Sequence, residues 1–209
     1  MQIKICGLTR KEDVDLCSQL GVNALGFIMA ESPRYIEIEK VAEISRDLTP
    51  FTSKVAVVMN PGEKLIRKII KSNIFDYIQF HGEEDPDLIS SVPIKTIKTI
   101  SIDTKDNSGL EEIKKYKNAN YFLFDSKIAN KKGGTGKKFD WSILNKLNIN
   151  KPYILAGGLS VDNIEEAITT LNMKGLDLNS KLEISPGIKD HNLIKKTVKI
   201  IRDFQINNF

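Results

Sequence analysis

Short runs of β-branched and aromatic residues alternate with amphipathic segments along the whole chain, and no linker interrupts them. No other property limits the possible folds as much, because this alternation indicates repeated strand–helix units and a parallel sheet. The runs expected to be strands are Gln2–Cys6, Ala24–Met29, Lys54–Asn60, Tyr77–His81, Ile94–Ile100, Tyr121–Asp125, Tyr153–Ala156 and Gly175–Leu178. The segments expected to be helices are Lys11–Leu20, Ile38–Leu48, Glu63–Lys71, Pro86–Ser91, Leu110–Tyr116, Ser142–Leu147, Val161–Leu171 and Leu193–Phe204.

About eight such units in 209 residues fit a compact (β/α)8 barrel, the TIM-barrel form of the α/β class. An open, doubly wound sheet is the alternative, but it usually has fewer strands and a glycine-rich first turn that this chain lacks. We therefore expect one barrel domain over residues 1–209. Asp140, Ser160 and either Thr9 or Lys11 are expected near helix N-termini, where a short polar side chain can accept hydrogen bonds from free backbone N–H groups.

The charged residues are evenly mixed along the chain. There are 31 Lys and Arg residues and 27 Asp and Glu residues, and the net charge is +4. This pattern predicts an ordinary solvated surface without a nucleic-acid partner. No apolar run approaches the ~18 residues of a membrane span. Cys6 and Cys17 are too few for a disulfide framework, and no apolar leader precedes Lys4, so we expect a cytoplasmic protein.

In a barrel of this type the active site lies at the carboxyl ends of the strands. Strand periodicity directs Cys6, Gln79, His81 and Asp125 to the inside of the barrel at these ends. A thiol and a carboxylate in one barrel mouth are a potential base and acid. The alternatives are that Cys6 is an inert core residue and that Asp125 caps a loop or helix.

The loops after the last two strands predict a phosphate site. Gly157 and Gly158 follow the seventh strand, where bare backbone N–H groups could converge on an anion. Ser180 and Lys181 follow the eighth strand and offer further donors, although a tight turn without a ligand is the alternative reading. Arg34 follows the second strand and could clamp a carboxylate with two hydrogen bonds.

Another glycine-rich segment, Gly133–Gly136, lies among lysines after the sixth strand. The Walker spacing is not met, because Lys137 is followed by Lys138. We therefore interpret it as a loop over the barrel mouth and not as a nucleotide site.

Together these segments resemble the phosphoribosylanthranilate isomerase family over the full length of the chain. The matching segments are Lys4–Thr9, Gly26–Phe27, Ser32–Arg34, Gln79–Gly82, Asp125, Gly133–Gly136, Phe139–Trp141, Leu155–Leu159 and Pro186–Asp190. The resemblance implies an isomerase of tryptophan biosynthesis that acts on N-(5-phosphoribosyl)anthranilate by an Amadori rearrangement. It further implies a phosphorylated small-molecule partner, a monomer or homodimer, and neither a metal nor an organic cofactor.

The resemblance also assigns roles. It implies that Asp125 is the general acid, that Cys6 is the general base, and that Arg34 holds the anthranilate carboxylate. It places further residues around the substrate and its phosphate, namely Gln79, His81, Gly157, Gly158, Asp177 and Ser180. The chain departs from the family pattern at Lys181, where a glycine is usual, so the geometry of the phosphate loop is expected to differ.

An ordinary thiol is largely protonated at neutral pH. Lys4 shares a strand face with Cys6 and is expected to lower the pKa of that thiol, whereas Cys17 is expected to be a core residue.

Two rival interpretations remain, another phosphosugar barrel and a barrel without catalytic activity. The related histidine-pathway isomerase would have an Asp where this chain has Cys6, and a ribulose-phosphate epimerase would need more histidines than His81 and His191. A barrel that only binds a phosphorylated ligand or an acidic polymer would not need Cys6 or Asp125.

Overall fold

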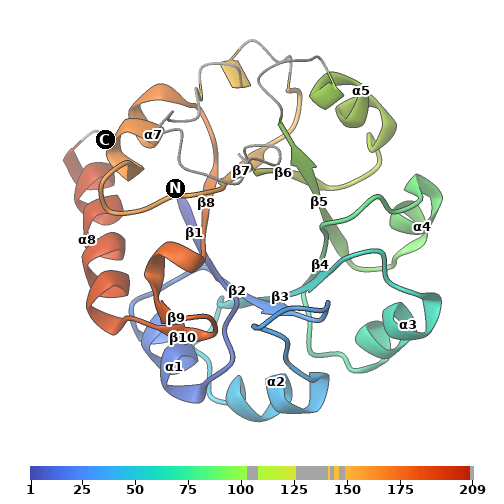
Figure 1. The fold of residues 1–209 in the computed structure, drawn as a ribbon, viewed down its shortest axis with the longest axis horizontal. Helices are drawn as coiled ribbons and strands as arrows, with labels where there is room; N and C mark the ends of the chain where they lie inside the picture. Colours follow the sequence, from blue (N-terminus) through green and yellow to red (C-terminus); the bar gives the residue numbers. More distant parts are fainter. Residues whose placement is uncertain (103–107, 126–140, 142–143, 146–148, 208–209) are drawn as a thin grey trace.

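Eight parallel strands close into a barrel in which each strand pairs with its neighbours in the sequence and β1 pairs with β8 (Figure 1). The computed structural model describes residues 1–102, 108–125, 141, 144–145 and 149–207. The barrel strands are β1 (Gln2–Cys6), β2 (Ala24–Ile28), β3 (Ser53–Val58), β4 (Tyr77–Phe80), β5 (Lys95–Ser101), β6 (Tyr121–Asp125), β7 (Tyr153–Ala156) and β8 (Gly175–Leu178). The expected (β/α)8 fold is confirmed.

The helices form a ring around the barrel (Figure 1). They are α1 (Lys11–Gln19), α2 (Ile38–Ile44), α3 (Glu63–Lys71), α4 (Pro86–Ser91), α5 (Ser108–Lys115), α7 (Ile164–Thr170) and α8 (His191–Asn207). Between β8 and α8 the chain adds a 3-10 turn, η1 (Ser180–Leu182), and a small antiparallel hairpin of β9 (Glu183–Ser185) and β10 (Ile188–Lys189). The expected helix Ser142–Leu147 lies largely outside the described residues, as do Asp140 and the Gly133–Gly136 segment.

One expected helix start is confirmed and one is displaced. α1 begins at Lys11, as expected, whereas the alternative start Thr9 does not cap the helix, because its hydroxyl donates to the Gly187 carbonyl over a distance of 2.6 Å. Ser160 does not open α7 directly, because the helix begins at Ile164 after a turn in which the Ser160 carbonyl accepts from the Ile164 N–H at 3.1 Å. Asn60, expected at the end of a strand, adopts a left-handed conformation with φ of 47°, so β3 ends before it.

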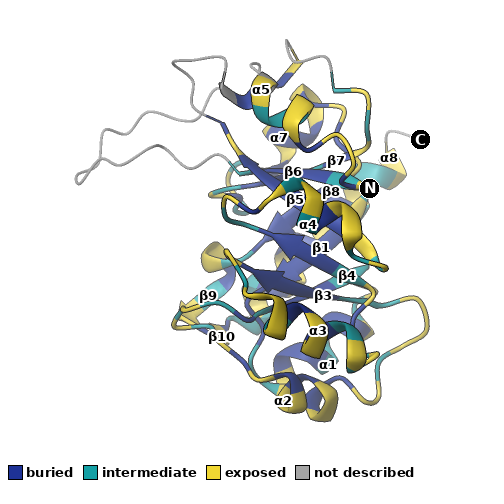
Figure 2. Cartoon of the chain, turned by 90° about the vertical axis from the view of Figure 1, so that its right-hand side faces the viewer, coloured by how far each residue is buried: buried dark blue, intermediate teal, exposed yellow. Residues whose placement is uncertain are grey.

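The apolar residues form two separate layers. The larger layer lies between the barrel and the helices and includes Ile3, Ile5 and Cys17. The smaller layer fills the barrel itself and consists of Cys6, Val55, Val57, Ile97, Leu123 and Ala156. This division follows the two-residue period of the strands, so alternate positions face the helices or the barrel interior. Figure 2 shows the buried strands between helices with exposed outer faces.

The described helices include none that is long and apolar enough to cross a membrane.

Candidate active site

A cavity of about 430 Å³ opens at the carboxyl ends of the barrel strands. Its lining includes all the residues that the sequence placed in the site, namely Cys6, Arg34, Gln79, His81, Asp125, Gly157, Gly158, Asp177 and Ser180. Lys181 also lines it. These residues come from the ends of β1, β4, β6 and β8 and from the loops after β2, β7 and β8, so the closed barrel brings together positions that are distant in sequence.

A second cavity of about 240 Å³ lies at the opposite end of the barrel. Apolar and aromatic side chains, among them Val55, Tyr77, Ile97, Tyr121 and Ile154, dominate its lining. It lacks the thiol, the strand-end carboxylates and the glycine turns that converge at the carboxyl ends, so chemistry belongs to the larger cavity.

The thiol of Cys6 fits into the barrel because the neighbouring strand carries a glycine. Cys6 pairs in register with Gly26 of β2. A Cβ atom at Gly26 would lie 2.7 Å from the Cys6 sulfur, which is closer than two such atoms can approach. The glycine therefore leaves the space that the thiol occupies, and Cys6 is only 4% exposed.

A buried ion pair lies behind this thiol. Lys4 of β1 is in register with Asp177 of β8, and the Lys4 Nζ donates to the Asp177 Oδ2 at 2.7 Å. Burial alone would lower the pKa of Lys4, but Asp177 and Cys6 outweigh it and the pKa is raised. The second oxygen of Asp177, Oδ1, is buried and has no hydrogen-bond partner within the described residues. A substrate hydroxyl could satisfy it.

Lys4 has the expected effect on Cys6, but the pKa of the thiol is raised overall. Burial raises the pKa of the Cys6 thiol above its ordinary value, and Asp177 raises it further. Lys4 lowers it, as expected, and Lys189 does so as well, but the two ammonium groups do not overcome burial. The thiol therefore holds its proton more tightly than an ordinary cysteine does. Burial raises the pKa of Cys17 to about 12, in keeping with its position in the core.

Asp125 is the last residue of β6, and His81 directly follows β4. The His81 Nε2 lies 3.8 Å from the Asp125 Oδ2, which is an ion-pair distance and too long for a direct hydrogen bond. Both side chains are partly exposed to the cavity. Gln79, deeper in the barrel, donates from Nε2 to the Thr99 hydroxyl at 3.1 Å, and its Oε1 has no partner among the described residues.

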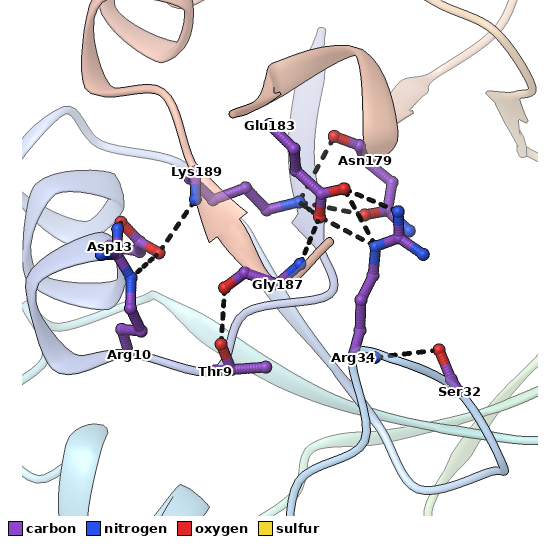
Figure 3. Close-up of polar contacts among 9 residues, drawn as sticks. All are labelled: Thr9, Arg10, Asp13, Ser32, Arg34, Asn179, Glu183, Gly187 and Lys189. Atoms are coloured by element: carbon purple, nitrogen blue, oxygen red, sulfur yellow. Dashed lines mark hydrogen bonds and ion pairs between the residues drawn. The ribbon is translucent and has the colours of Figure 1, made fainter. Parts of the chain in front are cut away.

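Arg34 lines the cavity but is already engaged. Its Nε and Nη2 donate to the two carboxylate oxygens of Glu183 at 2.8 and 2.6 Å (Figure 3). The sequence predicted a carboxylate clamp at Arg34, and in this structure the clamped carboxylate is that of Glu183. Arg34 comes from the loop after β2 and Glu183 from β9, so the pair spans the end of β1.

The loops after β7 and β8 supply the expected anion-binding elements. Gly157 and Gly158 have φ of 89° and 66°, in the left-handed region that favours glycine. A Cβ atom at Gly158 would meet nothing within 4 Å, so its backbone borders open space. Ser180 begins η1 and faces the same cavity.

No group of three or more His, Cys, Asp and Glu side chains is placed to hold a metal ion in the part of the chain that the structure describes.

Comparison with known proteins decides the family. The model of the family described as "N-(5'phosphoribosyl)anthranilate (PRA) isomerase" matches residues 3–200. The chain belongs to this family. It is 55% identical over 207 residues to the N-(5'-phosphoribosyl)anthranilate isomerase of Petrotoga mobilis, covering 99% of both chains. It is 38% identical over 204 residues to that of Legionella pneumophila strain Corby, covering 96% of this chain and 97% of the relative.

Solved structures of phosphoribosyl anthranilate isomerases agree. The Thermotoga maritima enzyme has a TM-score of 0.87 and 32% identity, with 97% of this chain and 99% of that chain covered. A complex with reduced 1-(o-carboxyphenylamino)-1-deoxyribulose 5-phosphate has a TM-score of 0.85 and 30% identity, with the same coverage. The chain is therefore an isomerase of tryptophan biosynthesis, and the rival phosphosugar barrels and the non-catalytic binding barrel are set aside.

The sequence pattern assigned no role to Glu183, and it assigned Lys181 and Lys189 only a general role as donors to an anion. Glu183 and Lys189 lie in the β9–β10 hairpin, which is too short to show a strand period. Lys181 replaces the usual glycine, yet it is not among the described non-glycine residues with positive φ, which are Phe51, Asn60 and Asn73. The turn therefore does not depend on glycine, and the exposed Lys181 side chain adds a positive charge to the cavity rim.

Proposed function

We propose that the chain isomerises N-(5-phosphoribosyl)anthranilate in the cavity at the carboxyl ends of the strands, with Asp125 as general acid and Cys6 as general base. One observation carries this proposal: a carboxylate and a thiol from different strands line one cavity together with Arg34 and the glycine turn after β7. The cavity thus offers an acid, a base and two separate sites for anionic groups, which is what a substrate with a carboxylate and a phosphate requires.

The first step is ring opening. Asp125 donates a proton to the furanose ring oxygen, the C1′–O bond breaks, and the lone pair of the anilino nitrogen forms a protonated Schiff base. Asp125 is the last residue of β6 and lines the cavity. Its Oδ2 lies 3.8 Å from the His81 Nε2, so a polar ring is the neighbour of the proposed acid. General acid catalysis of this kind contributes about 10²–10⁴-fold to a rate.

The second step is proton abstraction. Cys6 removes the proton from C2′, and the released electron pair moves to the iminium nitrogen to give an enolamine. Tautomerisation then gives the ketone, 1-(2-carboxyphenylamino)-1-deoxyribulose 5-phosphate. Burial raises the pKa of Cys6, and Lys4 and Lys189 lower it only in part. The positive charge of the substrate iminium adds to these two ammonium groups, and the three charges together favour formation of the thiolate.

The remaining site residues bind the substrate. Arg34 holds the anthranilate carboxylate. The backbone N–H groups of Gly157 and Gly158 and the Ser180 hydroxyl hold the phosphate, while Gln79, His81 and Asp177 contact the sugar. The orphan Asp177 Oδ1 and Gln79 Oε1 both supply acceptors for substrate hydroxyls.

The decisive experiment compares three variants with the wild type. It measures turnover of freshly generated phosphoribosylanthranilate through the loss of anthranilate-type fluorescence. Cys6→Ser and Asp125→Asn should each lose about 10²–10⁴-fold in kcat. Cys17→Ala, which removes the other buried thiol, should keep wild-type kcat. Wild-type turnover that survives both site substitutions would exclude the proposed acid and base.

We also infer a single domain, a cytoplasmic location, and a monomer or homodimer. Pairing of β1 with β8 ties the start of the barrel to its end, which supports one cooperative unit. A solved structure of Thermotoga maritima phosphoribosylanthranilate isomerase, at a TM-score of 0.82 and 27% identity, is described as a monomer made from a dimeric protein. Limited proteolysis and light scattering would test the domain and the assembly.

A further inference from the structure

The guanidinium group of Arg34 is held by the buried carboxylate of Glu183. Glu183 is only 4% exposed in its side chain, and its two oxygens accept from the Nε and Nη2 of Arg34 at 2.8 and 2.6 Å (Figure 3). This paired geometry uses one edge of the guanidinium. The N–H groups of Nη1 and the second hydrogen of Nη2 point away from Glu183.

A second cation fixes Glu183 from behind. The Lys189 ammonium, which is fully buried, donates to the Glu183 Oε1 at 2.9 Å and to the Asn179 Oδ1 at 3.0 Å. The Gly187 N–H also donates to the Glu183 Oε1 at 3.3 Å. Burial alone would raise the pKa of Glu183, but Arg34 and Lys189 lower it below its ordinary value, so the carboxylate is ionised. The two cations exceed the one anion, and the cluster keeps a net positive charge.

The Arg34 side chain also has a fixed path. It passes over Gly7, where a Cβ atom would lie 2.7 Å from the Arg34 Cδ and 2.7 Å from the Asn179 Oδ1. Gly7 has φ of 72° and directly follows Cys6. The guanidinium is therefore positioned over the backbone at the end of β1 by Gly7 on one side and by the Glu183 carboxylate on the other.

We propose that Glu183 is a positioning residue that orients the Arg34 guanidinium, so that its free edge receives the carboxylate of the substrate's aromatic ring. The inference rests on the proposed function of Arg34. Without Glu183, the arginine side chain would keep its charge but lose its fixed orientation, and paired recognition of a carboxylate depends on orientation. Glu183 would then determine selectivity for a substrate that carries this carboxylate.

The test measures binding, so that it does not depend on the catalytic roles of Cys6 and Asp125. The two probes are reduced 1-(o-carboxyphenylamino)-1-deoxyribulose 5-phosphate and the same compound without the ring carboxylate, each titrated by calorimetry. Glu183→Gln should weaken the first probe by about tenfold, the order of one well-oriented charged contact, and leave the second within about twofold. In an Arg34→Met background, Glu183→Gln should change neither affinity further.

A matched control removes a similar pair elsewhere. Glu63 accepts from Arg67 at 2.6 Å on the exposed surface of α3, and Glu63→Gln should change neither affinity. Equal weakening of both probes by Glu183→Gln would indicate a general structural role and overturn the proposal, as would unchanged binding of both. Binding of the second probe also reports that the variant site is folded. Failure of the wild type to distinguish the two probes would overturn the proposed function of Arg34 itself.

Discussion

At the scale of single residues, the site depends on two glycines whose lack of a side chain leaves space for other groups. Gly26 and Gly7 flank Cys6 on the neighbouring strand and along the chain, and each leaves room for a side chain of the site. Gly26 accommodates the sulfur of Cys6, and Gly7 accommodates Arg34 and Asn179. Both glycines belong to segments that the sequence associated with the family, and the structure supplies the steric reason.

Gly26→Ala should impair catalysis more than folding. The new methyl group would stand 2.7 Å from the Cys6 sulfur and displace it, and a displacement of about 1 Å costs about 10²-fold in rate. The cost in the free energy of unfolding should be about 1–3 kcal/mol, typical of an overpacked core. Kinetics and thermal unfolding measure the two effects. Gly62→Ala, where a Cβ atom would meet nothing within 4 Å, is the control and should leave kcat unchanged. Retained wild-type kcat in Gly26→Ala would contradict the proposed position of the base.

Lys4→Met should move the pH dependence of the enzyme. Cys6 must lose its proton to act as a base, and Lys4 is one of the groups that lowers its pKa. Removal of the ammonium raises that pKa, so the limb on which kcat/KM increases with pH should shift to higher pH. The profile of kcat/KM from about pH 5 to about pH 10 measures this shift. An unmoved limb would show that Lys4 does not tune the thiol.

At the scale of elements, the sequence predicts the barrel units well because each has its own periodic pattern. β1, β6, β7 and β8 have the expected bounds, as do α3 and α4. The β9–β10 hairpin escaped prediction because its strands contain three and two residues. Glu183 was missed as a consequence, since its contact with Arg34 joins residues 149 positions apart and leaves no local signal.

A buried ion pair holds the loop between β4 and α4, which carries His81. Lys98 and Glu84 are each 1% exposed in their side chains, and the Lys98 Nζ donates to the Glu84 Oε2 at 3.1 Å. Lys98 also donates to the Gly82 carbonyl, and the Gly82 N–H donates to the Glu84 Oε1 at 2.8 Å. The loop next to His81 is thus fixed by charge-assisted hydrogen bonds.

Lys98→Met should therefore lower the free energy of unfolding by about 3–5 kcal/mol, because it leaves the Glu84 carboxylate buried without its cation. The double variant Lys98→Met, Glu84→Gln should be less destabilised than the single one, since no uncompensated charge remains. Urea unfolding followed by circular dichroism measures both. A double variant that is less stable than Lys98→Met would indicate that the hydrogen bonds of Glu84 matter more than its charge.

At the scale of the whole molecule, the two ends of the barrel have different chemistry. The carboxyl ends of the strands carry the thiol, carboxylates and glycine turns, and the opposite end carries an apolar cavity. Close to this second end, in the segment before β3, Phe51 is 99% exposed and has φ of 70°. Ser53, two residues after Phe51, lines this cavity, so the exposed ring belongs to the same end of the barrel. We predict a homodimer in which a two-fold axis lets the ring of each copy enter the cavity of the other.

Phe51→Asp should therefore convert a dimer into a monomer without loss of catalysis. A carboxylate cannot enter the apolar cavity without a large desolvation cost, so the variant should have half the wild-type mass by light scattering. Its kcat/KM should stay within about twofold, because the proposed site lies at the other end of the barrel. Met59→Asp is a matched control, since Met59 is also exposed but lies after β3 at the catalytic end and should leave the mass unchanged. A wild type that is monomeric at all protein concentrations would remove the basis for this interface and leave Phe51 as an exposed ring without a partner copy.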